Sequence, residues 1–144
     1  MRKINLIVIH CSATRSNRRF TVEQLRACHN ARFHNKGIGY HYYIEQDGHV
    51  YQTRDEQEIG IHALNYNAHS IGVCYEGGLD EHGNPDDTRT PAQKQSLLTL
   101  LRTLKEDYPN AEIKGHCELP NVHKECPCFS CQEYRDYFAQ LQGE

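Results

Sequence analysis

The sequence predicts an α/β fold, a single domain with a central mixed β-sheet flanked by helices. Apolar segments of strand length alternate along the chain with amphipathic segments of helix length. The pair Asp47-Gly48 separates two segments rich in tyrosine and β-branched residues, which predicts a hairpin and therefore an antiparallel strand pair in the sheet. The 144 residues suit one domain, and we expect it to span residues 1–144.

The predicted strands follow from short apolar runs and their flanking turns. Residues 5–9 and 70–75 are nearly continuous apolar runs, typical of strands that are buried on both faces. Residues 40–45 and 49–53 flank the Asp-Gly turn, and residues 111–114 form a short run before Gly115-His116. Because these strands alternate with helices but include a hairpin, the sheet should be mixed and not purely parallel.

Three helices are predicted from their N-terminal signals and apolar faces. A threonine or serine followed three residues later by glutamine or glutamate is the signature of a capping box. It occurs at Thr21 with Gln24, at Thr90 with Gln93 and at Ser130 with Glu133. The expected apolar faces are Val22, Leu25, Cys28 and Ala31 or Arg32; Leu97, Leu98, Leu101 and Leu104; and Tyr134, Tyr137, Phe138 and Leu141.

Composition excludes several functional classes. The mean hydropathy is -0.79, and no segment approaches the roughly eighteen apolar residues of a membrane span, so no membrane partner is expected. The net charge is -3 and basic residues are scattered apart from Arg15, Arg18 and Arg19, which argues against a nucleic-acid partner. The apolar run after Met1 is too short for a signal peptide, so we expect synthesis in the cytoplasm. No long exposed apolar helix is predicted, so we expect a monomer.

The seven cysteines point to reduced thiols rather than to a disulfide framework, because their number is odd and no export signal is predicted. Cys126, Cys128 and Cys131 fall within six residues, which suggests metal or reactive chemistry there. Free cysteine is also a common small buried residue, so this clustering does not by itself define a site.

Three potential metal ligands lie just beyond predicted strands. His10 follows the first strand, His116 follows the last, and Cys126 lies in the adjoining loop. Sites in open α/β sheets are usually found beyond the strand ends. Two imidazoles and one thiolate suit zinc and leave a fourth position for water. Position alone leaves another interpretation open, in which the histidines are hydrogen-bonded strand-end residues and Cys126 is a buried thiol.

A series of short motifs makes the prediction more specific. They are HCSAT, GYHYYI, DG, RDE, SIGV, GH and KECPCF, at residues 10–14, 39–44, 47–48, 54–56, 70–73, 115–116 and 124–129. Together they resemble the N-acetylmuramoyl-L-alanine amidase type 2 family, in particular its phage T7 lysozyme-like branch. Peptidoglycan recognition proteins share the fold of this family. The resemblance extends from about residue 4 to about residue 138.

The resemblance implies an activity and a set of site residues. The activity is zinc-dependent hydrolysis of the amide bond between the lactyl group of N-acetylmuramic acid and L-alanine in peptidoglycan, performed by an endolysin that reaches the cell wall after release. One catalytic Zn²⁺ would be held by His10, His116 and Cys126, with muramyl peptides as the partner. Tyr40 and Lys124 match active-site residues of the family. His62 matches a histidine near the cleft, either a substrate contact or a residue behind the metal ligands.

Several alternatives stay open at this point. A non-catalytic peptidoglycan-binding module is one, although Cys126, the ligand that such modules lose, is present. A regulatory interaction protein and a zinc hydrolase of free peptides are two others that the sequence supports less well. The loop before Lys124 is about two residues longer than in the phage branch. A structural zinc bound there by His123, Cys126, Cys128 and Cys131 is therefore conceivable.

Overall fold

The computed structural model describes residues 1–142. No helix in this range is long and apolar enough to cross a membrane. The strands are β1 (Leu6–Cys11), β2 (Thr14–Arg15), β3 (Tyr42–Ile44), β4 (Val50–Gln52), β5 (Ser70–Tyr75), β6 (Gly78–Leu79) and β7 (Glu112–Gly115). The helices are α1 (Val22–Arg32), α2 (Pro91–Asp107), α3 (Gln132–Gln142) and the 3₁₀ turns η1 (Asn67–His69) and η2 (His116–Glu118).

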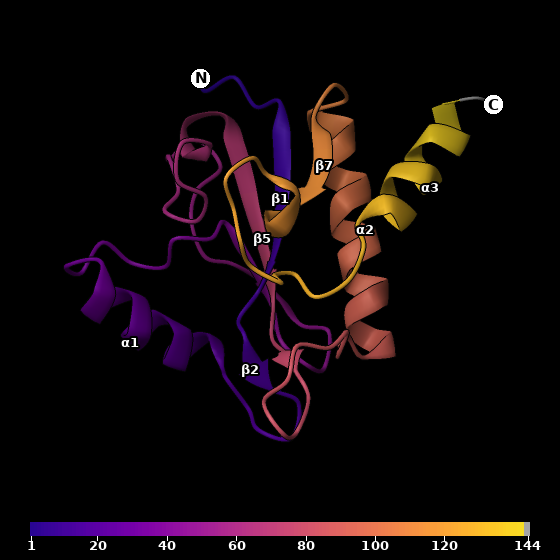
Figure 1. Ribbon diagram of the computed structural model, residues 1–144. Coiled ribbons are helices and arrows are strands. Elements are labelled where there is room, and N and C mark those ends of the chain that lie inside the picture. The colour runs from indigo at the N-terminus through magenta and orange to yellow at the C-terminus, as the bar shows by residue number, and fades with distance from the viewer. Residues whose placement is uncertain (143–144) are drawn as a thin grey trace.

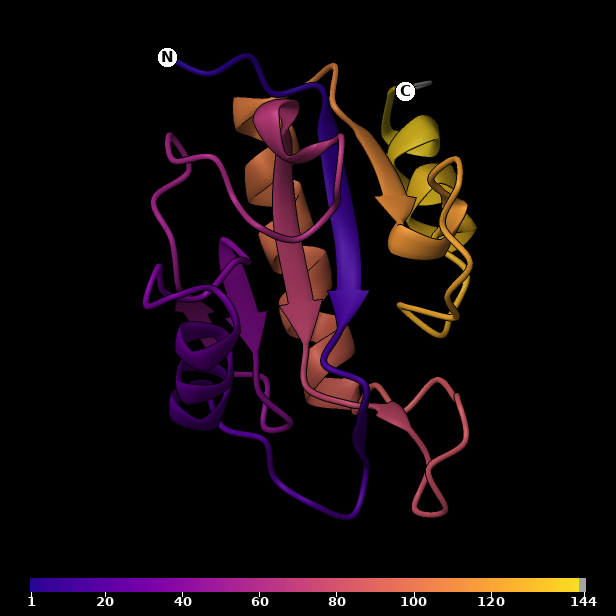
Figure 2. The same cartoon turned by 60° about the vertical axis from the view of Figure 1, so that its left-hand side comes forward.

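The main sheet has five strands in the order β4-β3-β5-β1-β7 (Figure 2). β1 pairs in parallel with β5 on one side and with β7 on the other, so that Ile7 lies level with both Ile71 and Ile113. β3 is parallel to β5, whereas β4 returns antiparallel to β3 after the turn at Asp47 and Gly48. The predicted mixed sheet and its hairpin are therefore confirmed.

The helices cover opposite faces of this sheet, with α1 on one side and α2 and α3 on the other (Figure 1). Side chains alternate along β1, so Ile7 and Ile9 join the core beneath α2 and α3. Leu6 and Val8 contribute to a smaller cluster on the opposite face. His10 has the same parity as Leu6 and Val8, and β1 therefore directs it to the face that carries α1.

The helix starts at residues 21 and 90 are as predicted. The hydroxyl of each cap threonine, Thr21 and Thr90, accepts a hydrogen bond from the backbone N–H three residues on. The glutamine at that third position, Gln24 or Gln93, accepts in return from the backbone N–H of the threonine. These bonds satisfy N–H groups that have no partner within the helix, which is why the local sequence sets the start of α1 and α2.

The predicted apolar face of α1 is correct at Val22 and Leu25 but wrong beyond them, where residues 28, 31 and 32 are all exposed. Cys28 is exposed, and the buried residues are Val22, Leu25 and His29. A spacing of three and then four residues follows the 3.6-residue helical repeat. The sequence pattern favoured Cys28 because cysteine is more apolar than the histidine that follows it. The burial of His29 matters because His29 lines the site described below.

The prediction for α3 needs three corrections. The helix begins at Gln132, whose N–H donates to the hydroxyl of Ser130 at 3.2 Å. The Glu133 carboxylate, expected to close a capping box, instead accepts from Arg89 at 2.8 Å. Leu141, expected on the apolar face, is 45% exposed, whereas Phe138 is buried in the core.

The predicted strand around residues 40–45 is too long, and a small sheet was missed. β3 begins only at Tyr42, so Tyr40 lies in the loop before it. Thr14 of β2 lies level with Gly78 of β6 in a separate two-stranded parallel sheet. Two-residue strands carry no periodicity, so the sequence could not indicate them.

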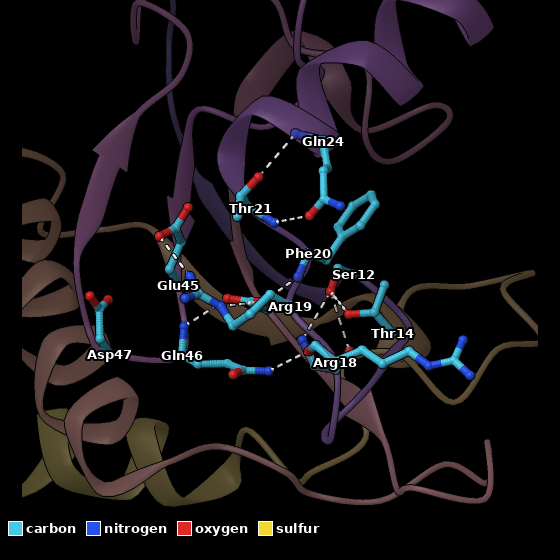
Figure 3. A network of polar contacts seen from close by, with 12 residues as sticks. Ser12, Thr14, Arg18, Arg19, Phe20, Thr21, Gln24, Glu45, Gln46 and Asp47 are labelled. Carbon is cyan, nitrogen blue, oxygen red and sulfur yellow. Dashed lines mark hydrogen bonds and ion pairs between the residues drawn. The ribbon is translucent and has the colours of Figure 1, made fainter.

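A polar network fixes the start of α1 against the ends of β3 and β5 (Figure 3). The Glu45 carboxylate accepts from Arg19 at 3.0 Å and from the N–H of Val22 at 2.8 Å. The buried Glu76 carboxylate accepts from the N–H groups of Phe20 and Gln46 and from Arg19. Buried carboxylates are stable only when they are hydrogen-bonded and paired, and here both conditions are met. The network thereby sets the position of the helix that walls the site.

Candidate active site

His10 is 2% exposed and lies one residue before the end of β1. The strand extends to Cys11, two residues beyond its predicted end, because its pairing with β5 continues to Cys11 and Tyr75. The imidazole is thus carried by a strand that is still paired with β5 at this position, rather than by a loop. This placement restricts the directions in which its two ring nitrogens point.

His116 and Cys126 are brought to His10 by β7 and the loop that follows. β7 is parallel to β1 and ends at Gly115, so His116 begins the next turn beside the end of β1. The loop then folds back, and the N–H of Cys117 donates to the carbonyl of Cys126 at 2.7 Å. The turn η2, which begins at His116, is stabilised by the Glu118 carboxylate, which accepts a hydrogen bond from the N–H of Gly115.

The three predicted ligands converge. One donor atom from each of His10, His116 and Cys126 lies within 4.8 Å of the other two. The His10 and His116 ring centroids are 4.6 Å apart, and Cys126 Sγ lies 3.9 Å from His10 Nδ1. Two imidazoles and a thiolate on one side of a cavity are the donor set of a three-ligand zinc site with an open position. The residues therefore fit a zinc ion.

The surroundings favour the protonation states that a metal requires. Burial lowers the pKa of His10 well below its usual value, and the neighbouring His62, His116 and Lys124 lower it further. Burial also lowers the pKa of His116, with Lys124 contributing. Both imidazoles are then neutral at pH 7 and able to offer a lone pair. The N–H of Cys11 donates to Cys126 Sγ at 3.2 Å, which orients the sulfur.

Tyr40 and Lys124 border the same site. The Tyr40 ring centroid lies 5.0 Å from that of His10, and burial raises the tyrosine pKa well above its usual value, so the phenol keeps its proton. Lys124 is exposed on the loop before Cys126, and no carboxylate within residues 1–142 forms an ion pair with it. All the predicted site residues line one cavity of about 850 Å³: His10, Tyr40, His62, His116, Lys124 and Cys126.

His62 lines the cavity and also contacts His10 on the side away from the other two candidate metal ligands. Its Nδ1 is 2.9 Å from His10 Nε2, and its Nε2 is 3.2 Å from the hydroxyl of Ser70. Burial lowers the pKa of His62 to about 3, with His41 contributing, so this ring is neutral. Of the two roles expected for His62, this geometry favours the one behind the metal ligands.

His29 is a cavity residue that the sequence did not reveal. It is buried on the inner face of α1, and its Nδ1 accepts from the N–H of Gly39 at 2.9 Å. Its ring centroid lies 5.2 Å from that of Tyr40, and it lines the same cavity. The available signal was its helical spacing from Val22 and Leu25, which Cys28 obscured.

The alternative zinc group receives no support within residues 1–142. His10, His116 and Cys126 are the one set of three or more potential ligands there whose donor atoms converge. Cys131 is completely buried in the core beneath α3. Cys128 Sγ lies 3.9 Å from Cys11 Sγ, and Cys128 does not line the cavity.

The fold and the converging His-His-Cys group place the chain in the class of α/β proteins with a candidate metal site at the ends of the strands, and comparison with known proteins identifies the family. The family model for N-acetylmuramoyl-L-alanine amidase matches residues 1–129. The endolysin of Escherichia phage T7 is 41% identical over 131 residues, which cover 89% of this chain and 83% of the endolysin. The chain therefore belongs to the N-acetylmuramoyl-L-alanine amidase family and is an amidase of the phage endolysin type.

Solved structures agree with this assignment. The endolysin amidase LysCS from Clostridium intestinale superimposes with a TM-score of 0.79 at 31% identity, covering 96% of this chain and 85% of LysCS. A point mutant of Drosophila PGRP-LB, solved in complex with tracheal cytotoxin, has a TM-score of 0.70 at 21% identity, covering 88% of this chain and 76% of that protein. The second likeness shows the shared fold alone.

Proposed function

We propose that this amidase is zinc-dependent and hydrolyses the bond between the lactyl carbonyl of N-acetylmuramic acid and the amino group of L-alanine in peptidoglycan. The observation that carries the proposal is the convergence of His10, His116 and Cys126 beside Tyr40 and Lys124 in one cavity. All five side chains belong to one chain, which supports action as a monomer. The endolysin relatives support a role on the cell wall after release from the cytoplasm.

The metal would supply the activation that amide hydrolysis needs. A zinc ion held by His10, His116 and Cys126 would polarise the scissile carbonyl and lower the pKa of a water molecule toward neutrality. The chain's own contribution is to hold the three donors in place on β1, in the turn that follows β7, and in the returning loop. The N–H of Cys11 adds a hydrogen bond that orients the sulfur of Cys126.

Lys124 and Tyr40 would act on the substrate directly. The Lys124 ammonium, free of any carboxylate within residues 1–142, would face the negative charge that develops on the lactyl oxygen. The Tyr40 phenol, which keeps its proton because of burial, would donate a hydrogen bond to the attacking or developing oxygen.

Muramyl peptides fit the cavity in size and chemistry. Its volume of about 850 Å³ lies in the range of sites that enclose a drug-sized ligand. Apolar Ile61, Ala63, Leu64 and Val122 line it together with polar Asn65 and Asn67, a mixture suited to a peptide and an N-acetylated sugar. The fold shared with the recognition protein that was solved with tracheal cytotoxin supports this class of substrate.

Mass spectrometry of digested peptidoglycan tests the proposal. Purified sacculi are incubated with the protein as isolated, after removal of metal by a chelator, and after zinc is restored. We expect free stem peptides with an L-alanine amino terminus in the first and third samples and almost none in the second. Intact muramyl peptides in all three samples would instead favour a binding module. New reducing sugar ends would show that the enzyme cuts a different bond.

A further inference from the structure

The His10 imidazole makes a different contact through each ring nitrogen. Nδ1 faces Cys126 Sγ at 3.9 Å, on the side of the candidate zinc. Nε2 lies 2.9 Å from Nδ1 of His62, on the opposite side. Nε2 of His62 then lies 3.2 Å from the hydroxyl of Ser70. His10, His62 and Ser70 therefore form a row of hydrogen bonds that leads away from the metal ligands and ends at the first residue of β5.

The protons in this row have only two self-consistent arrangements, because a neutral imidazole has one donor nitrogen and one acceptor nitrogen. In the first, His10 donates from Nε2 to His62, and His62 donates from its own Nε2 to Ser70. In the second, Ser70 donates to His62, and His62 donates from Nδ1 to His10, whose remaining proton then lies on Nδ1. Only the first arrangement leaves a lone pair on His10 Nδ1 for a metal.

Packing holds His62 in this row. Its backbone N–H donates to Asn67 Oδ1 at 3.0 Å. Its ring lies directly over Gly72, where an added Cβ would come within 2.7 Å of the imidazole. His41 is the nearest other ring of this kind, with its centroid 5.8 Å away, but it is engaged elsewhere. Its Nδ1 accepts from the N–H of Gly72 at 3.0 Å, and its Nε2 donates to the carbonyl of Glu58 at 2.8 Å.

We infer that His62 and Ser70 are positioning residues that keep the proton of His10 on Nε2 and leave Nδ1 free to bind zinc. The inference deepens the proposed function and rests on it for the identity of the metal. A carboxylate or a carbonyl usually fills this place behind a metal-bound histidine. Here a second histidine fills it, and a completely buried serine hydroxyl fixes the orientation of that histidine. His62 thus acts through His10, and not mainly on the substrate.

The first measurement is the tautomer of His10 in the zinc-free protein. Long-range ¹H–¹⁵N correlation NMR on protein with labelled histidine distinguishes a protonated ring nitrogen from an unprotonated one. We expect His10 to be protonated on Nε2 in the wild type and to lose this preference in His62→Leu, which removes the acceptor for the Nε2 proton. A wild-type His10 that carries its proton on Nδ1 overturns the inference. This measurement requires neither zinc nor activity.

The second measurement is zinc affinity by competition with a chromophoric chelator. His62→Leu should weaken zinc binding by about 10- to 100-fold, the usual effect of removing the hydrogen-bond partner of a metal ligand, and Ser70→Ala should weaken it by less because Ser70 contacts His62 and not His10. Ser70→Thr, which retains the hydroxyl, should restore most of the affinity, and the exposed Ser16→Ala should not change it. His62→Asn offers an acceptor near the position of Nδ1 and should bind zinc more tightly than His62→Leu. Denaturant unfolding of each zinc-free variant checks that it folds.

The outcomes separate this inference from the proposed function. Zinc affinity that is unchanged in both Ser70→Ala and His62→Leu, in protein that cleaves muramyl peptides, overturns the inference and leaves the amidase proposal intact. The expected tautomer and affinities in a protein that leaves muramyl peptides uncut would support the inference and refute the proposed substrate. A folded wild type that binds no zinc would refute both.

Discussion

Cys126→Ala should lose bound zinc and nearly all amidase activity while keeping its fold. Cys126 supplies one of three converging donors, and two imidazoles alone leave the metal weakly held. Polarisation by a metal contributes several kcal/mol to amide hydrolysis, and about 4 kcal/mol corresponds to roughly a 10³-fold loss of rate. The backbone contact between Cys117 and Cys126 does not involve the side chain, so the loop should remain closed.

Zinc content by elemental analysis and kcat/KM on a muramyl peptide check this result together. Cys28→Ala is the matched control because Cys28 is exposed on α1 and does not line the cavity. That variant should retain zinc and activity. A Cys126→Ala protein that still holds one equivalent of zinc would remove Cys126 from the ligand set, and Cys128 would then be the next thiol to examine.

Lys124→Ala should retain zinc but reduce kcat by about 10²- to 10³-fold, the usual cost of removing one group that stabilises a developing oxyanion. The residue lines the cavity but is not one of the converging donors, so metal affinity should hardly change. If Lys124 acts mainly in the transition state, kcat and kcat/KM should fall by similar factors with KM almost constant.

The matched control for this prediction is Lys94→Ala, an exposed lysine on α2 on the opposite side of the sheet. Steady-state kinetics on a muramyl peptide and zinc analysis of the same samples provide the comparison. A large rise in KM with unchanged kcat would show that Lys124 only binds substrate. Loss of zinc from the variant would show that it supports the metal centre instead.

Local signals explain why most of the fold could be predicted. The capping boxes at Thr21 and Thr90 involve residues three apart, and the turn at Asp47 and Gly48 is set by a backbone conformation at Gly48 that glycine adopts easily. Interactions between residues this close in sequence can be recognised from the local sequence alone. Glu133 shows where local signals fail. It has the sequence spacing of a capping box, but its carboxylate accepts a hydrogen bond from Arg89, which is 44 residues away in sequence.

The site was predictable only in part. His10 and Cys126 are more than a hundred residues apart, and their contact depends on β7 lying parallel to β1, so their spacing alone could not reveal it. Family motifs supplied what spacing could not. The family motifs left two roles open for His62, and its contact with His10 could not be predicted because it depends on a loop held by Asn67 and on the space above Gly72.

X-ray absorption at the zinc edge of the wild-type protein tests most directly whether this chain holds a catalytic zinc as proposed. We predict one sulfur at about 2.3 Å, two imidazole nitrogens at about 2.0–2.1 Å and one further light atom in the position left open for water or substrate. A shell of two or more sulfurs would contradict the account and point to the neighbouring cysteines. A shell composed only of oxygen would show that His10, His116 and Cys126 do not bind the metal.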